Sequence, residues 1–182
     1  MSIFILAGHT PKGIHPDPGA VANGFREADL TLELRDKIAD KLRGKGCKVY
    51  EDDDSLRLAE VLADVKSTEK DIVCDIHFNA GPETATGIEV LIPARSTEDE
   101  RDLARKLCSI LSSIMKIRNR GVKSESDGQH KSLGVMRESG INVLIEMCFI
   151  TNKTDMLAYK TNIEKVADEI MYLLIEYDNK YL

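Results

Sequence analysis

The sequence predicts a single α/β domain with a mainly parallel sheet and helices layered on it. Three observations predict this fold class. Short apolar runs of strand length alternate along the chain with longer segments of helical period. The 182 residues suit one domain that is large enough to bury a core. At roughly 100–200 residues per domain, we expect residues 1–182 to form one domain without a second targeting or regulatory module. No stretch approaches the ~20 uninterrupted apolar residues of a membrane span.

Five runs have the length and the Ile, Val and Phe content of strands. Some are continuously apolar and others alternate with period two, as strands do. The predicted strands are Ile3–Ala7, Lys48–Tyr50, Ile72–Phe78, Ile88–Ile92 and Val143–Ile150.

Four apolar stripes at spacings of three and four predict helices between and after these strands. Gly44 and Gly46 fit the end of the first helix, and the run from Ser96 to Glu100 fits an N-cap with first-turn acids for the third. The stripes are Leu30, Leu34, Ile38 and Leu42, then Leu58 and Leu62, then Leu103, Leu107, Leu111 and Ile114, and finally Ile163, Val166, Ile170 and Leu174.

Two segments, residues 10–24 and 118–133, fit neither pattern and are too long for simple connections. The first holds three of the five prolines, and the second is basic. Loops of this kind after strands usually line a site, so we expect both to border one.

Charge and cysteine usage exclude some classes of function. The chain has 25 Lys and Arg against 31 Asp and Glu, a net charge of −6, which argues against a nucleic-acid partner. The four cysteines have no metal-binding spacing, and three lie in apolar runs, which suggests reduced, buried thiols. The first residues lack the basic region of a signal peptide, so we expect synthesis in the cytoplasm.

Polar residues at strand ends mark a candidate site. His9 ends the first strand, His77 lies near the end of the third, and Glu146 interrupts the apolar fifth, so all three map to the carboxyl edge of the sheet, where such folds bind ligands. Glu27 precedes Leu30 on the core-facing stripe of the first helix, where a carboxylate needs a cation or strong hydrogen bonds.

Two histidines and a glutamate make a catalytic zinc set with a fourth position left for water, and Glu146 would move the proton of that water. Structural roles compete with this interpretation. Glu27 could complete a capping box with Gly24 as N-cap, a histidine at a strand end can be structural, and Glu146 could form an inward ion pair.

Weaker candidates lie in the loops and in an acidic run. His15 and His130 could assist as ligands or substrate contacts, and Arg118, Arg120 and Lys123 could hold an anionic group, although a solvated basic loop is the simpler expectation. The run from Glu51 to Asp54 is expected to form a solvated turn, with Asp54 or Ser55 capping the next helix.

Taken together, these residues resemble a known family. The segments that carry the likeness are Ile5–His9, Asp17–Ala20, Glu27 with Leu30, Ile76–Ala80, Gly87–Val90, Arg120–Lys123, Leu133–Arg137 and Leu144–Asn152. In order and approximate spacing they resemble the zinc-dependent N-acetylmuramoyl-L-alanine amidases of the Amidase_3 type, over residue 3 to about 175. The resemblance implies a sheet of about six mostly parallel strands with helices on both faces, and a catalytic domain without a separate wall-binding domain.

Carried over residue by residue, the resemblance implies that His9, Glu27 and His77 bind one Zn²⁺ ion and that Glu146 is the catalytic glutamate. The implied reaction is hydrolysis of the amide between N-acetylmuramic acid and the L-alanine of the stem peptide by zinc-activated water, so peptidoglycan or a muramyl peptide would be the substrate. A residue that departs from the family pattern is Cys148, which stands where glycine is usual.

Two other functions remain open: a zinc exopeptidase of related sheet architecture, and a catalytically idle module that binds wall fragments. The first would cleave free peptides, and the second would release no new amines from sacculi. We expect the protein to act on the cell wall after release from the cytoplasm, as a phage endolysin or an autolysin would, while the target species, stem peptide and oligomeric state stay open.

Overall fold

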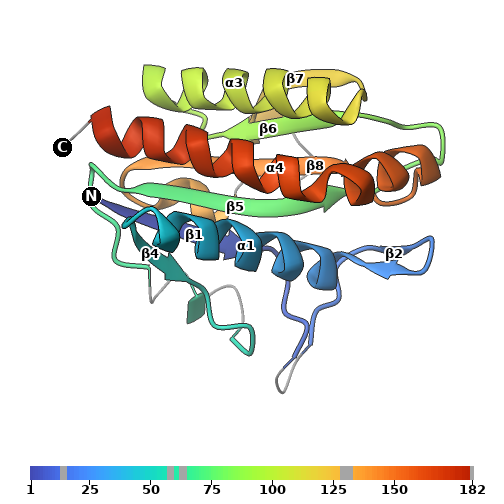
Figure 1. The fold of residues 1–182 in the computed structure, drawn as a ribbon, viewed down its shortest axis with the longest axis horizontal. Helices are drawn as coiled ribbons and strands as arrows, with labels where there is room; N and C mark the ends of the chain where they lie inside the picture. The colour runs from blue at the N-terminus through green and yellow to red at the C-terminus, as the bar shows by residue number, and fades with distance from the viewer. Residues whose placement is uncertain (13–15, 57–59, 62–64, 128–132, 181–182) are drawn as a thin grey trace.

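The computed structural model describes residues 1–12, 16–56, 60–61, 65–127 and 133–180. It contains a six-stranded sheet with the strand order β4-β1-β5-β8-β6-β7 (Figure 1). The first four of these are parallel, whereas β6 runs antiparallel to β8 and parallel to β7. The strands are β1 Ser2–Ala7, β4 Lys48–Glu51, β5 Ile72–Asn79, β6 Ile88–Ile92, β7 Asn119–Ser124 and β8 Ile141–Phe149; a hairpin pairs β2 Val21–Ala22 with β3 Phe25–Arg26. The predicted single-domain fold with a mostly parallel sheet is confirmed.

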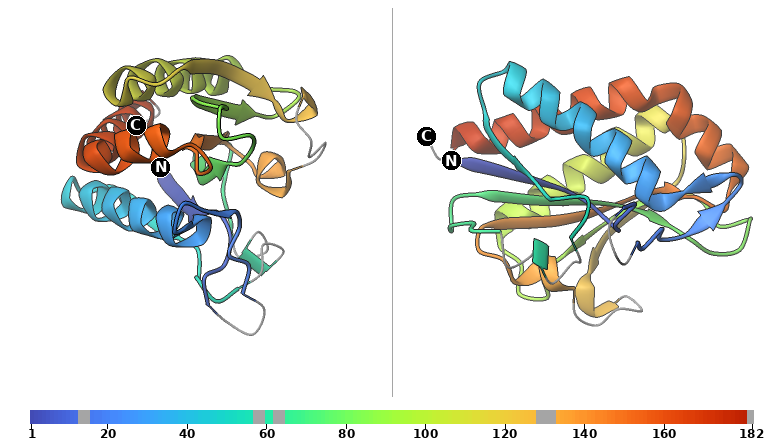
Figure 2. Two further views of the ribbon diagram at one scale, coloured as in Figure 1. Left: turned by 90° about the vertical axis from the view of Figure 1, so that its right-hand side faces the viewer. Right: turned by 90° about the horizontal axis from the view of Figure 1, so that it is seen from below.

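Three long helices, α1 Glu27–Gly44, α3 Glu98–Met115 and α4 Lys153–Lys180, lie side by side on one face of this sheet (Figures 1 and 2). None of the helices that the structure describes is long and apolar enough to cross a membrane. The other face carries a 3-10 helix, η2 Gly134–Arg137, which packs near Leu144 and Val73; a second, η1 Glu125–Asp127, follows β7. The helix expected around Leu58 and Leu62 falls on residues 57–59 and 62–64, which lie outside the described residues.

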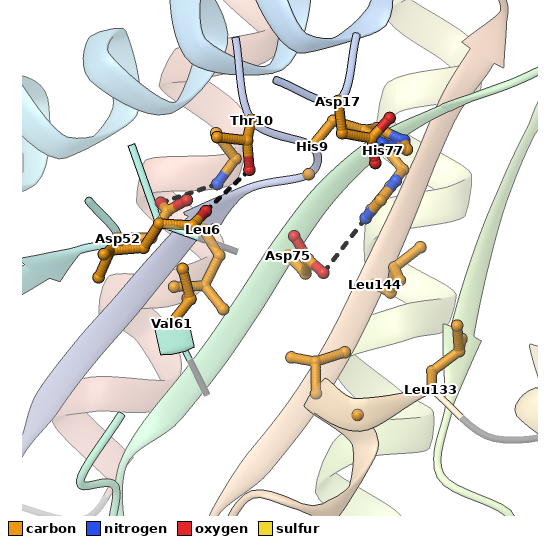
Figure 3. Close-up of a pocket in the computed structure, with 15 residues that line it drawn as sticks. Leu6, His9, Thr10, Asp17, Asp52, Val61, Asp75, His77, Leu133 and Leu144 are labelled. Atoms are coloured by element: carbon orange, nitrogen blue, oxygen red, sulfur yellow. Dashed lines mark hydrogen bonds and ion pairs between the residues drawn. The ribbon is translucent and has the colours of Figure 1, made fainter. Parts of the chain in front are cut away.

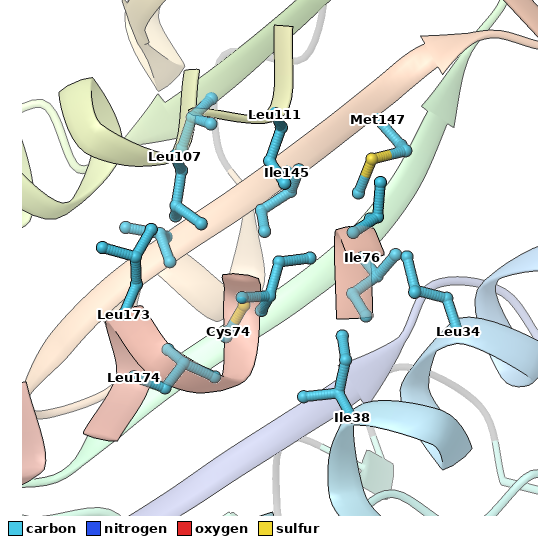
Figure 4. Close-up of a cluster of buried hydrophobic side chains, with 14 of the residues drawn as sticks. Leu34, Ile38, Cys74, Ile76, Leu107, Leu111, Ile145, Met147, Leu173 and Leu174 are labelled. Atoms are coloured by element: carbon cyan, nitrogen blue, oxygen red, sulfur yellow. The ribbon is translucent and has the colours of Figure 1, made fainter. Parts of the chain in front are cut away.

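The stripes read from the sequence for α1, α3 and α4 contribute to the main core (Figure 4). Leu34 and Ile38 of α1 are fully buried, and each such side chain contributes about 1.5–3 kcal/mol of transfer free energy to folding. Helix α3 begins with the expected N-cap and first-turn acids. Its N-cap Thr97 and Glu100 also form a capping box, in which each side chain accepts the other's backbone N–H. Helix α1 ends at Gly44 as expected.

The two long irregular segments contain strands that the sequence did not predict. Strand β2 lies at the end of residues 10–24, and its hairpin partner β3 follows directly after that segment. Strand β7 lies at the start of the basic segment 118–133. Strand β7 is mostly polar and forms an edge of the sheet, so it lacks the apolar run that marks the buried strands.

The acidic run is not simply a solvated turn. The side chain of Asp52 is 5% exposed and accepts hydrogen bonds from the backbone N–H of Ala7 at 3.0 Å and from Arg35 Nη1 at 2.9 Å. Arg35, itself buried, also pairs with Asp54. The expectation of a solvated turn is therefore wrong for Asp52, because a guanidinium from α1 compensates its charge and fixes it at the end of β1.

Candidate metal centre

The carboxyl ends of three neighbouring strands bring the candidate residues to one edge. His9 follows β1 after Gly8, His77 lies near the end of β5, and Glu146 lies in β8 directly opposite His77 in the register of the two strands. Because side chains alternate between faces along a strand, neighbours in register stand on the same face. His77 and Glu146 therefore lie side by side.

His9 is held in a backbone conformation that a non-glycine residue rarely adopts, with φ of 73°. The preceding Gly8 donates its N–H to the carbonyl of Ile76 at 2.9 Å, and Thr10 forms a two-way backbone bridge with Asp17. These bonds maintain the left-handed turn, which points the imidazole of His9 at the sheet edge. Backbone strain of this kind is concentrated at functional sites.

Glu27 is the first residue of α1, and its side chain turns toward the sheet edge rather than capping the helix. The helix N-cap is Arg26, without a side-chain capping bond, and Gly24 lies in the turn between β2 and β3. The capping-box alternative for Glu27 is therefore wrong. The carboxylate is 5% exposed and accepts backbone N–H groups from Ala20 and Phe78, both at 2.9 Å.

His9, Glu27 and His77 converge so that one ligand atom of each lies within 4.8 Å of the others. Glu27 Oε1 is 3.2 Å from His9 Nε2 and 3.1 Å from His77 Nδ1. Burial would raise the pKa of Glu27, but the two histidines hold it well below its usual range. The structure thus brings together the three predicted ligands, whose two nitrogens and one carboxylate suit a divalent cation such as zinc.

Two glycines make room for this cluster. A Cβ on Gly8 would lie 2.3 Å from the His77 ring, and a Cβ on Gly19 would lie 2.5 Å from the His9 ring and 2.7 Å from Glu27 Oε2. A larger residue at either position would therefore displace one of the three candidate ligands.

Glu146 has the properties of a proton-transfer group. Its Oε2 is buried and has no hydrogen-bond partner among the described residues. Burial, with the nearby carboxylates of Glu27, Glu89 and Asp75, raises the pKa of Glu146 to about 7, although the neighbouring His77 opposes this shift. A carboxyl group that titrates near neutral pH suits both acceptance and donation of a proton.

The inward ion pair considered for Glu146 forms instead at its neighbour on β6. Glu89 accepts a hydrogen bond from Arg120 Nε at 2.8 Å and one from Asn79 Nδ2 at 2.8 Å, and the Arg120 guanidinium lies 5.0 Å from the centre of the Phe149 ring. The expectation of a solvated basic loop is wrong for Arg120, because β7 places it against Glu89. His15 and His130 lie outside the described residues.

Sequence reasoning gave no role to two aspartates beside the histidines. Asp17 Oδ2 lies 2.9 Å from His9 Nδ1, and Asp75 Oδ2 lies 3.3 Å from His77 Nε2. The period-two alternation of β5 could have indicated Asp75, since it precedes His77 by two residues and shares its face. Asp17 follows a loop, and no local pattern places it near His9.

A cavity of about 310 Å³ opens beside the histidines, on the sheet face opposite the long helices (Figure 3). His9, Asp17 and His77 lie at one end. Apolar side chains, among them Leu133 and Leu144, line the other end. The candidate ligands therefore border a space that could receive part of a substrate.

Known proteins are similar in sequence to nearly the whole chain. Residues 3–175 match the N-acetylmuramoyl-L-alanine amidase family, Amidase_3. The uncharacterized protein YqiI of Bacillus subtilis is 34% identical over 176 residues, covering 93% of this chain and 81% of YqiI. The amidase LytC of the same organism is 27% identical over 170 residues, which cover 90% of this chain but 32% of LytC.

A solved structure agrees with these sequence matches. The crystal structure of an N-acetylmuramoyl-L-alanine amidase from Clostridium difficile 630 superposes with a TM-score of 0.73 and 27% identity, covering 99% of this chain and 95% of the other. The shared fold, the match over residues 3–175 and the clustered site lead to one conclusion: this chain belongs to the N-acetylmuramoyl-L-alanine amidase family.

Proposed function

We propose that this protein is a zinc-dependent N-acetylmuramoyl-L-alanine amidase that hydrolyses the amide between the lactyl group of muramic acid and the L-alanine of the stem peptide. One observation carries the proposal: the converging donor atoms of His9, Glu27 and His77 lie beside the buried Oε2 of Glu146, which has no hydrogen-bond partner among the residues that the structure describes. Family membership supports the same reaction class.

The donor set fits zinc. Catalytic zinc sites commonly have three nitrogen or oxygen ligands and keep a further position for water or substrate. His9, Glu27 and His77 would hold the ion, and when bound it would supply Lewis-acid activation of water and of the amide carbonyl.

Glu146 then moves the proton. It accepts one proton from water as the water oxygen adds to the amide carbonyl carbon, and it donates that proton to the alanine nitrogen as the carbon–nitrogen bond breaks. The second proton of the water passes from the new carboxylic acid to the amine, so the products are the lactyl carboxylate of muramic acid and a stem peptide with a protonated N-terminal amine. Within the described part of the chain, Oε2 of Glu146 has no hydrogen-bond partner. This supports the role, because a buried carboxyl oxygen without a partner reduces stability and therefore calls for a functional explanation.

The test uses purified sacculi, zinc-loaded protein and an assay for newly exposed L-alanine amines. We expect Glu146→Gln to keep the bound zinc and the unfolding midpoint while losing at least about 100-fold in rate, the lower range for a general acid–base group. Glu176→Gln is the matched control, since Glu176 is an exposed α4 residue paired with Lys106.

The alternatives predict different products. A zinc exopeptidase would release amino acids from free peptides that carry no sugar. An idle wall-binding module would leave the amine count of the sacculi unchanged in the wild type as well as in Glu146→Gln. Either result would refute the amidase proposal. Action on the wall after release from the cytoplasm stays a prediction.

A further inference from the structure

Each histidine of the cluster directs its two ring nitrogens at two carboxylates, one of which is the shared Glu27. His9 directs Nε2 at Glu27 Oε1 and Nδ1 at Asp17. His77 has the opposite arrangement, with Nδ1 at Glu27 Oε1 and Nε2 at Asp75. The nitrogens that converge on Glu27 are thus of different types, and each ring has a carboxylate behind it.

The two outer carboxylates differ in their surroundings. The side chain of Asp17 is 64% exposed, whereas that of Asp75 is 6% exposed. Among the described residues, Asp75 forms an ion pair with His77 alone. A buried carboxylate with a single ion-pair partner is costly to stability, so its presence beside His77 calls for a functional explanation.

A neutral imidazole carries one proton, so the nitrogen that keeps it donates a hydrogen bond while the other keeps a lone pair. A carboxylate fixed next to Nε2 holds the proton there and leaves the lone pair on Nδ1. In metal sites, a carboxylate that accepts the second N–H of a histidine fixes the tautomer and the ring orientation.

We propose that Asp75 is a positioning residue of the metal centre, which accepts the Nε2 proton of His77 and so commits Nδ1 of that ring to the ion. This inference rests on the proposed function only in assuming that the site binds zinc. Asp75 acts through His77 and does not touch the reacting atoms. Asp75 and His77 line the cavity together with the apolar side chains of Leu6 and Leu144 (Figure 3).

Zinc affinity, measured by competition with a coloured chelator, tests the proposal without any amidase assay. We expect Asp75→Ala to weaken zinc binding about 10- to 100-fold, the usual range for an outer partner of a metal-bound histidine. Asp75→Asn keeps an oxygen acceptor without the charge, so its affinity should lie between those of Asp75→Ala and the wild type.

The matched control is Asp71→Asn. Asp71 is also buried and lies four residues earlier, but it accepts hydrogen bonds from Ser2 and Thr68 at the opposite end of the sheet. This variant should lose stability and keep its zinc affinity. Thermal unfolding of every metal-free variant shows whether it is folded before zinc is added.

A spectroscopic measurement addresses the tautomer directly. In the zinc-loaded wild type, ¹⁵N–¹H correlation of the imidazoles should show His77 protonated at Nε2, with Nδ1 bound to the metal. Protonation at Nδ1, or wild-type zinc affinity in a folded Asp75→Ala variant, would overturn the proposal. If the wild type binds zinc as described but leaves sacculi intact, the amidase proposal fails and the role of Asp75 stands.

Discussion

Gly8 packs against the ring of His77, so replacement with alanine should disable the metal centre while the domain stays folded. A Cβ at this position would lie 2.3 Å from Cε1, 2.4 Å from Nε2 and 2.6 Å from Nδ1 of His77. Ordinary van der Waals contact begins at 3.4 Å, so Cε1 of His77 would have to move about 1.1 Å away from the added Cβ. Metal–ligand distances tolerate only about 0.2 Å. We therefore expect Gly8→Ala to lower zinc affinity at least about 100-fold, beyond the effect of losing an outer partner.

The assay is the same chelator competition, with the thermal unfolding midpoint as a check on folding. Gly44→Ala is the matched control, because Gly44 ends α1 with a helical backbone and no heavy atom lies within 4 Å of its added Cβ. It should leave zinc affinity unchanged and alter stability by no more than about 1 kcal/mol. A folded Gly8→Ala protein that binds zinc within threefold of the wild type would refute the reasoning, since His77 would then not be a fixed ligand.

Three further predictions concern the fold. Ile38→Ala should lower the free energy of unfolding by about 2–5 kcal/mol in urea, because Ile38 is fully buried; a loss under about 1 kcal/mol would contradict its place in the core. Burial would raise the pKa of Asp71, but hydrogen bonds from Ser2 and Thr68 lower it below the ordinary value. The ionised Asp71 therefore stabilises the fold fully above about pH 4, and this contribution is lost as the pH falls through the lower pKa that Asp71 has in the folded protein. Asp71→Asn should therefore cost about 1–3 kcal/mol near pH 7, with a deficit that narrows below pH 4 in urea denaturation; a deficit independent of pH would refute this. A thiol reagent should modify one cysteine of the native protein, the partly exposed Cys47, and all four in denaturant, because the others are buried; rapid reaction of a second thiol would contradict the packing.

The buried strands and helices could be predicted from the sequence because their apolar periods are strong. Strand β6 matches its predicted bounds, and the stripe through Leu34 and Ile38 is buried as α1 requires. The same stripe placed Glu27 on the inward side of its helix, and strand ends placed His9 and His77 at one edge. Local periodicity contains this information because each of these side chains takes its direction from its own element.

Features that depend on distant partners could not be predicted in this way. Asp52 is buried because Arg35 reaches it from 17 residues away, and nothing within the acidic run indicates that partner. Asp17 reaches the side chain of His9 because Thr10 and Asp17 form a backbone bridge within the irregular segment 10–24, which has no periodic pattern. Strand β7 is mostly polar, and it pairs with β6, from which the whole of α3 separates it in the sequence.

The reversed direction of β6 affects how the site could change over evolution. Since β6 runs against β8, it begins at the edge where β5 and β8 end, and the mostly exposed connection from β5 to β6 crosses the end of β8, where it contacts Phe149 and Thr151. Insertions or exchanges in residues 80–86 could therefore build new walls around the catalytic edge while the strands that carry the ligands keep their register. Recognition of different wall chemistries could thus be encoded in one short surface segment, separately from the chemistry of hydrolysis.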